Sequence, residues 1–423
     1  MSIVTKSNTL NVVIAGGSLG GLLCGIALKQ IGHNTTILER NPTPLLHNQG
    51  AGIVAGGDLL AFFKKYDRCQ RPIAVRSRAR MYLNKEGRII HREDRPQHMT
   101  SWDLVYYVLR ANYDGVKSDY CEVPASRPND GTAQHLHGHK VTGFKDLGDG
   151  IEVQFTTKDG MTGSMRADLL IGADGPSSTV RSILEPSVQR THAGYVALRG
   201  TVPEDQASDA AREVFQERFT FFHDEGIQIL AYLIPGINGA LEPGKRLVNW
   251  VWYINFPEHS PEFEELMTDK EGARHSITLP PGKMQEKVWE KLKKSAKEKL
   301  PPQFAELVQK TEKPFVQVIT DVICQRNEFC DGRVVLVGDA LAGFRPHTAA
   351  STSQAAFDAM ILADMLEGKI SREQWREETM HYAREIQQRG VQMGNRSQFG
   401  HHPLAEYARD RGSVDDRAKG APS

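Results

Sequence analysis

The chain has 423 residues, more than one compact core usually holds, so we expect two domains packed against each other. Lys and Arg total 52, and Asp and Glu also total 52, so no net charge attracts nucleic acid or an anionic membrane. The five cysteines form no CxxC pair, no apolar run has the length of a membrane span, and the first residues lack a secretion-signal pattern. We therefore expect a cytoplasmic protein with free thiols and a small-molecule partner.

The first forty residues predict a parallel βαβ unit. The apolar run 11–15 predicts a strand buried on both faces, and it leads into the turn GGSLGG (16–21) and a helix ending near Gly32. A second buried strand follows over residues 35–40 and ends beside Glu39. In such a turn, backbone N–H groups and the helix N-terminus can approach a diphosphate, and Glu39 can accept hydrogen bonds from a ribose. Because a serine replaces the usual second glycine, the alternative is a tight βα turn without a ligand.

The next segment predicts hairpins around one helix. A hairpin turns at Glu86-Gly87, helical spacing covers residues 101–113, and turn-rich alternation follows to about residue 166. His135, His137 and His139 are spaced for one strand face, but no cysteine or clear carboxylate set accompanies them. We expect a solvated loop here and no metal site.

Two further motifs each combine a buried strand with an acidic turn. GADGPSSTVR (172–181) contains Asp174, and GRVVLVGDA (332–340) contains Asp339. Ordinary turn chemistry and a capped helix are the respective alternatives to ligand binding. A helical stretch is expected from about residue 350 to residue 394.

Taken together, the three motifs resemble the single-component, class A FAD-dependent aromatic monooxygenases over residues 11–365. A nearer resemblance is to the branch that contains 2,6-dihydroxypyridine hydroxylase. It rests on GGSLGG with its serine, TSWDL (100–104) and RPHTAA (345–350). Many members of the wider class have an Arg where Ser101 stands and a His where Ala342 stands.

The resemblance implies an α/β fold like that of p-hydroxybenzoate hydroxylase. In such a fold, a Rossmann-like FAD-binding domain with a parallel sheet would be interleaved with a mostly antiparallel β-sheet substrate domain. We assign residues 1–75, 100–185 and 320–400 to the FAD-binding domain, 76–99 and 186–319 to the substrate domain, and 401–423 to a loose tail.

The resemblance also implies which residues bind FAD. The glycine turn and Glu39 would meet the ADP half, and Asp174 would serve both FAD and the nicotinamide cofactor. Asp339 would bind the ribityl chain, and Pro346 with its neighbours would lie along the isoalloxazine. The expected cofactor contacts are Gly16, Gly17, Ser18, Leu19, Gly20, Glu39, Arg40, Arg110, Asp174, Asp339, Pro346, Ala349 and Ala350.

The implied reaction is the hydroxylation of a small electron-rich aromatic or N-heteroaromatic compound. NADH or NADPH would reduce FAD, O2 would give a flavin hydroperoxide, and the substrate ring would attack its distal oxygen. Arg199 could orient an anionic oxygen, with a strand Arg in a surface ion pair as the alternative. His223, Tyr232 and His347 are candidates for the general base, each with a buried structural role as the alternative.

Several rivals stay open. The same chemistry could epoxidise an alkene or oxidise an indole, or the chain could bind FAD without turnover. WVWYI (250–254) is similar to a flavin-dependent halogenase motif, but Asn255 replaces its proline, and a strand core or pocket wall is the alternative. Substrate identity, nicotinamide preference and oligomeric state are not predicted, and a homodimer is left open.

Overall fold

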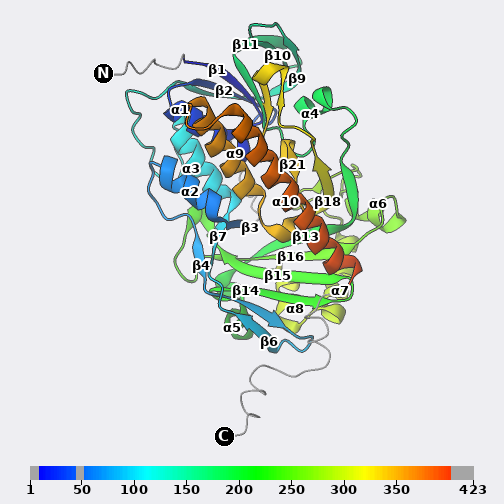
Figure 1. Ribbon diagram of the computed structural model, residues 1–423. Coiled ribbons are helices and arrows are strands. Elements are labelled where there is room, and N and C mark those ends of the chain that lie inside the picture. Colours follow the sequence, from blue (N-terminus) through cyan, green and yellow to red (C-terminus); the bar gives the residue numbers. More distant parts are fainter. Residues whose placement is uncertain (1–8, 44–51, 402–423) are drawn as a thin grey trace.

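The computed structural model describes residues 9–43 and 52–401. Two large sheets, each with its own helices, form the upper and lower parts of the molecule (Figure 1). The loose tail expected at 401–423 lies almost entirely outside the described residues. Within those ranges, no helix is long and apolar enough to cross a bilayer.

The upper part is built on a six-stranded sheet in the order β19-β20-β12-β1-β2-β8. All neighbouring strands are parallel except β19 and β20. Its strands are β1 (Asn11–Ala15), β2 (Asn34–Glu39), β8 (Ala133–His137), β12 (Leu169–Gly172), β19 (Glu328–Phe329) and β20 (Val334–Leu336). The central strands β1 and β12 are almost wholly buried, as expected of a sheet covered on both faces.

Helices cover one face of this sheet and a small sheet covers the other. The alternating residues of β1 enter two different cores, one shared with the helices and one shared with β9 and β10. The covering elements are α1 (Leu19–Gln30), α2 (Gly57–Tyr66), α3 (Trp102–Asp114), α9 (Ser351–Leu366), β9 (His139–Asp146), β10 (Ile151–Thr157) and β11 (Thr162–Ala167). The short helix α4 (Thr179–Leu184) follows β12.

The lower part is a nine-stranded sheet in which β14 and β5 form the one parallel pair among the recorded pairings. Its main path is β17-β18-β13-β16-β15-β14-β5-β6, and β21 pairs with β18. These strands are β5 (Ala79–Leu83), β6 (Ile89–Glu93), β13 (Thr191–Pro203), β14 (Arg218–Asp224), β15 (Ile227–Ile234), β16 (Leu247–Asn255), β17 (Thr278–Leu279), β18 (Phe315–Ile323) and β21 (Ala342–Gly343).

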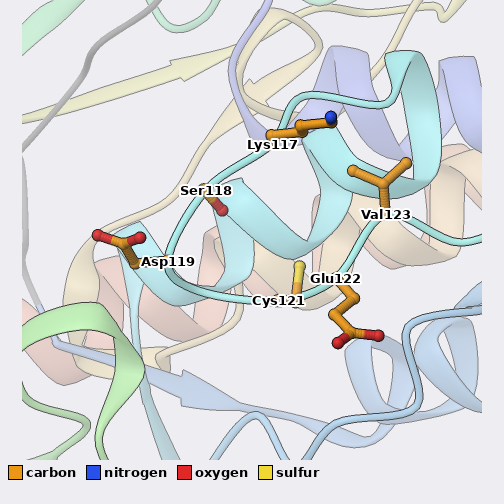
Figure 2. Close-up of a pocket in the computed structure, with 6 residues that line it drawn as sticks. All are labelled: Lys117, Ser118, Asp119, Cys121, Glu122 and Val123. Atoms are coloured by element: carbon orange, nitrogen blue, oxygen red, sulfur yellow. The ribbon is translucent and has the colours of Figure 1, made fainter.

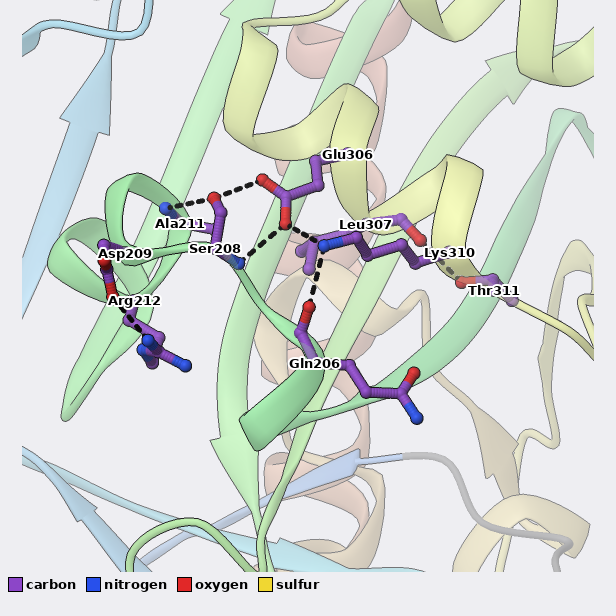
Figure 3. Close-up of polar contacts among 9 residues, drawn as sticks. All are labelled: Gln206, Ser208, Asp209, Ala211, Arg212, Glu306, Leu307, Lys310 and Thr311. Carbon is purple, nitrogen blue, oxygen red and sulfur yellow. Dashed lines mark hydrogen bonds and ion pairs between the residues drawn. The ribbon is translucent and has the colours of Figure 1, made fainter.

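The two faces of the large sheet have different neighbours. One face, which includes Trp250 and Trp252, packs against a helical layer. That layer consists of α5 (Asp209–Phe215), α6 (Pro261–Met267), α7 (Glu286–Lys299) and α8 (Pro302–Lys310). The Ser208 hydroxyl caps α5 and donates to Glu306 of α8 at 2.5 Å, while Lys310 donates to the same carboxylate at 2.8 Å (Figure 3). Trp250 and Trp252 are therefore core residues. A strand core was the alternative to the similarity with a halogenase motif.

The opposite face is rich in aromatic side chains and packs toward the upper part of the molecule. It meets a small sheet, β3-β7-β4. The strands of this sheet are β3 (Gly52–Ala55), β7 (Gln97–Ser101) and β4 (Val75–Ser77). This face includes alternate residues of β13, β15 and β16 and adjoins the candidate site.

The single helical stretch expected over residues 350–394 is two helices. The chain breaks at Gly368, whose φ of 72° is left-handed, and α10 (Arg372–Phe399) then starts under a Ser371 cap. Helix α10 runs from α9 down to the large sheet (Figure 1). There Ser397 donates to Gln228 at 2.6 Å, so this helix ties the two parts together.

Candidate functional site

A cleft of about 860 Å³ lies at the carboxyl ends of the parallel strands. This volume suits a cofactor or small-ligand site, and the position is where open α/β sheets bind ligands. Residues 274–278 and Gln317 of the lower part line its other side. The expected cofactor contacts in its lining are Gly16, Ser18, Glu39, Arg40, Asp174 and Asp339.

The glycine turn brings the backbone close to this cleft. Gly16 has a φ of +101°, a left-handed value that side chains disfavour. A Cβ on Gly16 would lie 2.5 Å from the carbonyl oxygen of Ala173, and one on Gly21 would overlap the Gly16 carbonyl oxygen. The turn therefore needs glycine at both positions and leaves room for a close backbone approach to a ligand.

The N-terminus of α1 suits an anionic group. Ser18 is its N-cap residue, yet the Ser18 side chain makes no capping hydrogen bond and lies exposed in the cleft. First-turn N–H groups without a side-chain cap can donate to a diphosphate. Leu19 is buried in the core, and Gly20 lies beside Ala355 of α9, so these two residues position the helix.

Glu39 lies at the end of β2 and faces the same turn. Its carboxylate accepts the Gly17 N–H and the Asn41 N–H, each at 2.7 Å. Arg40 is exposed at the cleft. Arg110 is held within its own helix, because it donates to Asp114 at 2.8 Å and to the Tyr106 hydroxyl at 2.7 Å. It does not line the cleft.

The expected solvated loop around His135 and His137 is wrong. Both residues belong to β8, which pairs with β2 so that His137 lies opposite Glu39. Their rings stack at 4.3 Å, and burial, with a smaller contribution from Arg110, lowers the pKa of His135 to about 3. The turn signals hid a strand whose partner is far away in the chain. The described residues contain no cluster of three or more potential metal ligands.

Asp174 holds the turn of the second motif. Its carboxylate accepts the Thr179 N–H at 2.6 Å and a hydrogen bond from the Ser178 hydroxyl. Burial raises its pKa above the ordinary value, against the effect of these hydrogen bonds. Asp174 thus organises the start of α4 while it lines the cleft.

Asp339 also lines the cleft, but the surroundings of its carboxylate differ from those of Asp174. Among the described residues no hydrogen bond to its carboxylate is present, and burial raises its pKa to about 6, with Arg190 and Arg181 opposing the rise. This half-buried carboxylate faces the cleft, so a hydroxyl donated by a ligand there could supply the missing hydrogen bond. This carboxylate and the close glycine turn together fit FAD.

Sequence reasoning missed two residues near Asp339. Asp358 of α9 accepts the Gly338 N–H at 2.7 Å and so fixes the Gly-Asp turn. Arg190 lines the cleft and donates to the Ser177 hydroxyl at 2.9 Å. Asp358 lies inside an apolar helix and Arg190 inside an irregular segment, so neither belongs to a recognisable sequence motif.

The loop before α9 is held from three sides. Arg345 donates to Asp321 at 2.5 Å and to Asn395 of α10 at 2.8 Å. The Tyr195 hydroxyl and His347 Nε2 are 2.9 Å apart. Burial, aided by the charge of Arg345, lowers the pKa of His347 to about 3, so its imidazole is neutral at pH 7. Pro346, Ala349 and Ala350 continue this loop into α9, and none of them lines the cleft.

Arg199 projects from the aromatic face of β13. It donates to the carbonyl oxygen of Gly52 at 3.2 Å and contacts Gln317 at 3.5 Å, and Gln317 lines the cleft. Burial lowers its pKa. Its recorded contacts among the described residues are Gln317, the Gly52 carbonyl oxygen and the Phe315 ring, and none of them is a carboxylate. The alternative of a surface ion pair is therefore wrong. A buried cation without a carboxylate suits an anionic ligand.

The remaining base candidates lie at different distances from Arg199. Tyr232 is buried on the same sheet face, and burial raises its pKa to about 12. His223 lies three strands away from β13, roughly 14 Å at normal strand spacing, and its ring is parallel to that of Phe221 at 6.1 Å. The structure thus groups His347 with Tyr195 and Tyr253, whose ring lies 4.3 Å from His347, and leaves His223 apart.

A second hollow, of about 520 Å³, lies on the surface over residues 117–123 (Figure 2). It is lined by Lys117, Ser118, Asp119, Cys121, Glu122 and Val123. None of the expected site residues is among them. The larger cleft is therefore the candidate functional site.

Comparison with known proteins agrees with this geometry. A family model described as "FAD binding domain-like" matches residues 192–321. The chain is 30% identical over 364 residues to 2,6-dihydroxypyridine 3-monooxygenase of Paenarthrobacter nicotinovorans, covering 84% of this chain and 83% of that protein. It is 25% identical over 363 residues to an aurachin C monooxygenase/isomerase of Stigmatella aurantiaca, covering 84% of this chain and 80% of that protein.

Solved structures show the same fold. The structure of 2,6-dihydroxypyridine-3-hydroxylase from Arthrobacter nicotinovorans superimposes with a TM-score of 0.80 at 26% identity, over 96% of this chain and 97% of the other. A salicylate hydroxylase substrate complex superimposes with a TM-score of 0.67 at 16% identity, over 96% and 92% of the two chains. The expected α/β fold with parallel and antiparallel sheets is confirmed.

The fold and the cleft define an FAD-dependent monooxygenase of the single-component aromatic hydroxylase class, as the sequence predicted. Within that class, the chain belongs to the family of 2,6-dihydroxypyridine 3-monooxygenase-like proteins.

Proposed function

We propose that the enzyme uses NADH or NADPH and O2 to hydroxylate a small electron-rich aromatic or N-heteroaromatic compound. One observation carries the proposal. The cleft that fits FAD shares Gln317 with the buried guanidinium of Arg199, which lacks a carboxylate partner. A substrate ring with an ionised hydroxyl would supply the missing negative charge and would be activated toward oxygen transfer.

We further propose that FAD binds to the upper part of the molecule, whose elements all come from the predicted FAD-binding segments 1–75, 100–185 and 320–400. The glycine turn and the α1 N-terminus would receive the diphosphate, and Glu39 would exchange its backbone partners for a ribose. Asp339 would accept a ribityl hydroxyl, and the loop from Pro346 to Ala350 would lie along the isoalloxazine. FAD, when bound, supplies the redox chemistry that takes electrons from the nicotinamide and activates O2.

The aromatic face of the large sheet would hold the substrate. Arg199 would bind its anionic oxygen, while Tyr232 and the tyrosines near His347 exclude water from the ring. His347 is neutral at pH 7, and in the tautomer whose Nε2–H donates to the Tyr195 hydroxyl its Nδ1 would accept a hydrogen bond from a substrate hydroxyl. Because its basicity is low, we assign it an orienting role ahead of full proton abstraction. The distant His223 receives no role.

Rates of NADH and NADPH oxidation by the FAD-loaded enzyme test the proposal. Each is measured alone and with hydroxypyridines, phenols and indoles. The proposal expects one hydroxylated ring to accelerate oxidation strongly, with matching oxygen uptake. Acceleration by an alkene or by an unhydroxylated indole alone would favour the epoxidase or indole oxidase. Bound FAD that no nicotinamide reduces, with any compound, would indicate a non-catalytic flavoprotein.

A further inference from the structure

Two cysteine thiols from separate parts of the chain contact the same helix, α3. Cys69 follows α2, and Cys121 follows α3. The Cys69 Sγ lies 4.0 Å from the Val108 carbonyl oxygen, and the Cys121 Sγ lies 3.9 Å from the Tyr107 carbonyl oxygen. These carbonyls are consecutive in α3, so the two sulfurs lie against the same turn of the helix, close enough for each thiol to perturb the pKa of the other. All five cysteines of the chain are free, so this contact joins two reduced thiols.

The surroundings give the two sulfurs different characters. The Cys69 thiol, together with Arg71, lowers the pKa of Cys121, whereas burial opposes this effect. Arg71 is fixed beside Cys121, because it donates to the carbonyl oxygens of Tyr120 and Gly239, the latter at 2.7 Å. The pKa of Cys69 is raised by the Cys121 thiol and by burial. Asn112 donates to the Cys69 Sγ at 3.3 Å, which helps to orient it.

Access also distinguishes the pair from the other cysteines. Cys121 lines the surface hollow over residues 117–123, where small solutes can approach it (Figure 2). Cys24 and Cys324 are fully buried. Cys330 is half-buried, but burial and the Asp146 carboxylate raise its pKa and disfavour its thiolate. The pair alone among the five thiols combines access, a neighbouring cation and a second sulfur.

We propose that Cys121 and Cys69 form a peroxide-oxidised pair that closes to a disulfide. The Cys121 thiolate attacks one oxygen of hydrogen peroxide, the O–O bond breaks, and hydroxide leaves. The product is a sulfenic acid on Cys121. The Cys69 sulfur then attacks the Cys121 sulfur, the S–O bond breaks, and the oxygen leaves as water with the Cys69 proton. In total two thiols and one peroxide give one disulfide and two waters.

The cross-link joins the segment after α2 to the segment after α3. It closes a chain loop of about fifty residues, which constrains the unfolded chain. Helix α3 begins at Trp102, and Trp102 lines the FAD cleft, whereas the thiols contact the middle of the helix. The oxidised enzyme is therefore expected to keep FAD bound and to gain thermal stability.

Stoichiometric hydrogen peroxide is added to the FAD-loaded enzyme, which is then alkylated and digested for peptide mass analysis. The proposal predicts a cross-linked peptide pair containing residues 69 and 121, a loss of two hydrogen atoms and an unchanged Cys330. Cys69→Ser is expected to stop at a sulfenic acid on Cys121 that dimedone traps. Cys121→Ser should prevent the reaction, and Cys330→Ser, the matched control, should react as the wild type does.

Two results would overturn the proposal. One is complete alkylation of Cys69 and Cys121, meaning that both thiols stayed reduced, in protein whose Cys330 has been oxidised. The other is overoxidation of Cys121 in the wild type without any link to Cys69. Both are read from the wild-type protein, so a variant that folds poorly does not affect the conclusion.

Discussion

Asp339→Asn is expected to change FAD binding and the stability of the apoprotein in opposite directions. Burial raises the pKa of Asp339 from 3.8 to about 6. The carboxyl group is neutral in the folded and the unfolded protein at low pH. As pH rises from about 4 to 6 it ionises more readily in the unfolded chain, so the folded apoprotein loses stability, and the loss is complete at pH 7. About two pKa units correspond to roughly 3 kcal/mol. Asn removes this cost, and we expect the apoprotein to gain about 2 kcal/mol at pH 7 and little at pH 4.

The same change removes the proposed acceptor of a ribityl hydroxyl. Loss of a hydrogen bond to a charged group costs about 1.5–3 kcal/mol, which weakens FAD binding by roughly ten- to a hundredfold. Flavin fluorescence measures the Kd, and thermal unfolding of the apoprotein at pH 4 and pH 7 measures stability. Asp205→Asn, at an exposed position, is the control and should change neither. An unchanged Kd, or an apoprotein that loses stability at pH 7, would refute the reasoning.

Three further changes test other parts of the site and fold. Gly16→Ala places a Cβ 2.5 Å from the Ala173 carbonyl oxygen, so FAD fluorescence titration should show a large loss of affinity. An unchanged affinity would mean that the turn can move to accommodate the side chain, which contradicts the reasoning. Arg199→Met should lower kcat/KM for an ionised substrate by about ten- to a hundredfold at unchanged FAD affinity, and an equal loss for neutral analogues would contradict a charge effect. Arg246→Met leaves the buried Glu204 carboxylate without its 2.5 Å partner and should cost about 3–5 kcal/mol in denaturant unfolding; a loss below 1 kcal/mol would refute this.

The fold could be predicted because its signals are local. Glycine at position 16 is required by a left-handed φ and a carbonyl contact within one βα turn, and the surrounding strands are continuous apolar runs. Asp174 and Asp339 each follow a buried strand, and the ends of parallel strands meet at one edge of the sheet. Local strand and turn patterns therefore marked these two residues as candidates, and the family resemblance implied that they bind FAD.

The rest of the site depends on contacts between distant segments. His137 lies opposite Glu39 only because β8 pairs with β2, and nothing within residues 133–137 identifies that partner. The hydrogen bond between Tyr195 and His347 joins two segments that are 152 positions apart. The burial that lowers the pKa of His347 comes from this tertiary packing, so its protonation could not be predicted from the sequence.

The central claim is that an FAD bound in the cleft directs one oxygen atom of O2 into a hydroxylated ring. Isotopically labelled O2 tests it most directly, with the substrate that most accelerates nicotinamide oxidation. The account predicts one labelled oxygen atom in the product for each nicotinamide consumed, and loss of labelling with the FAD-depleted protein. A product that carries oxygen from water, or nicotinamide oxidation that yields only hydrogen peroxide with every ring tested, would contradict it.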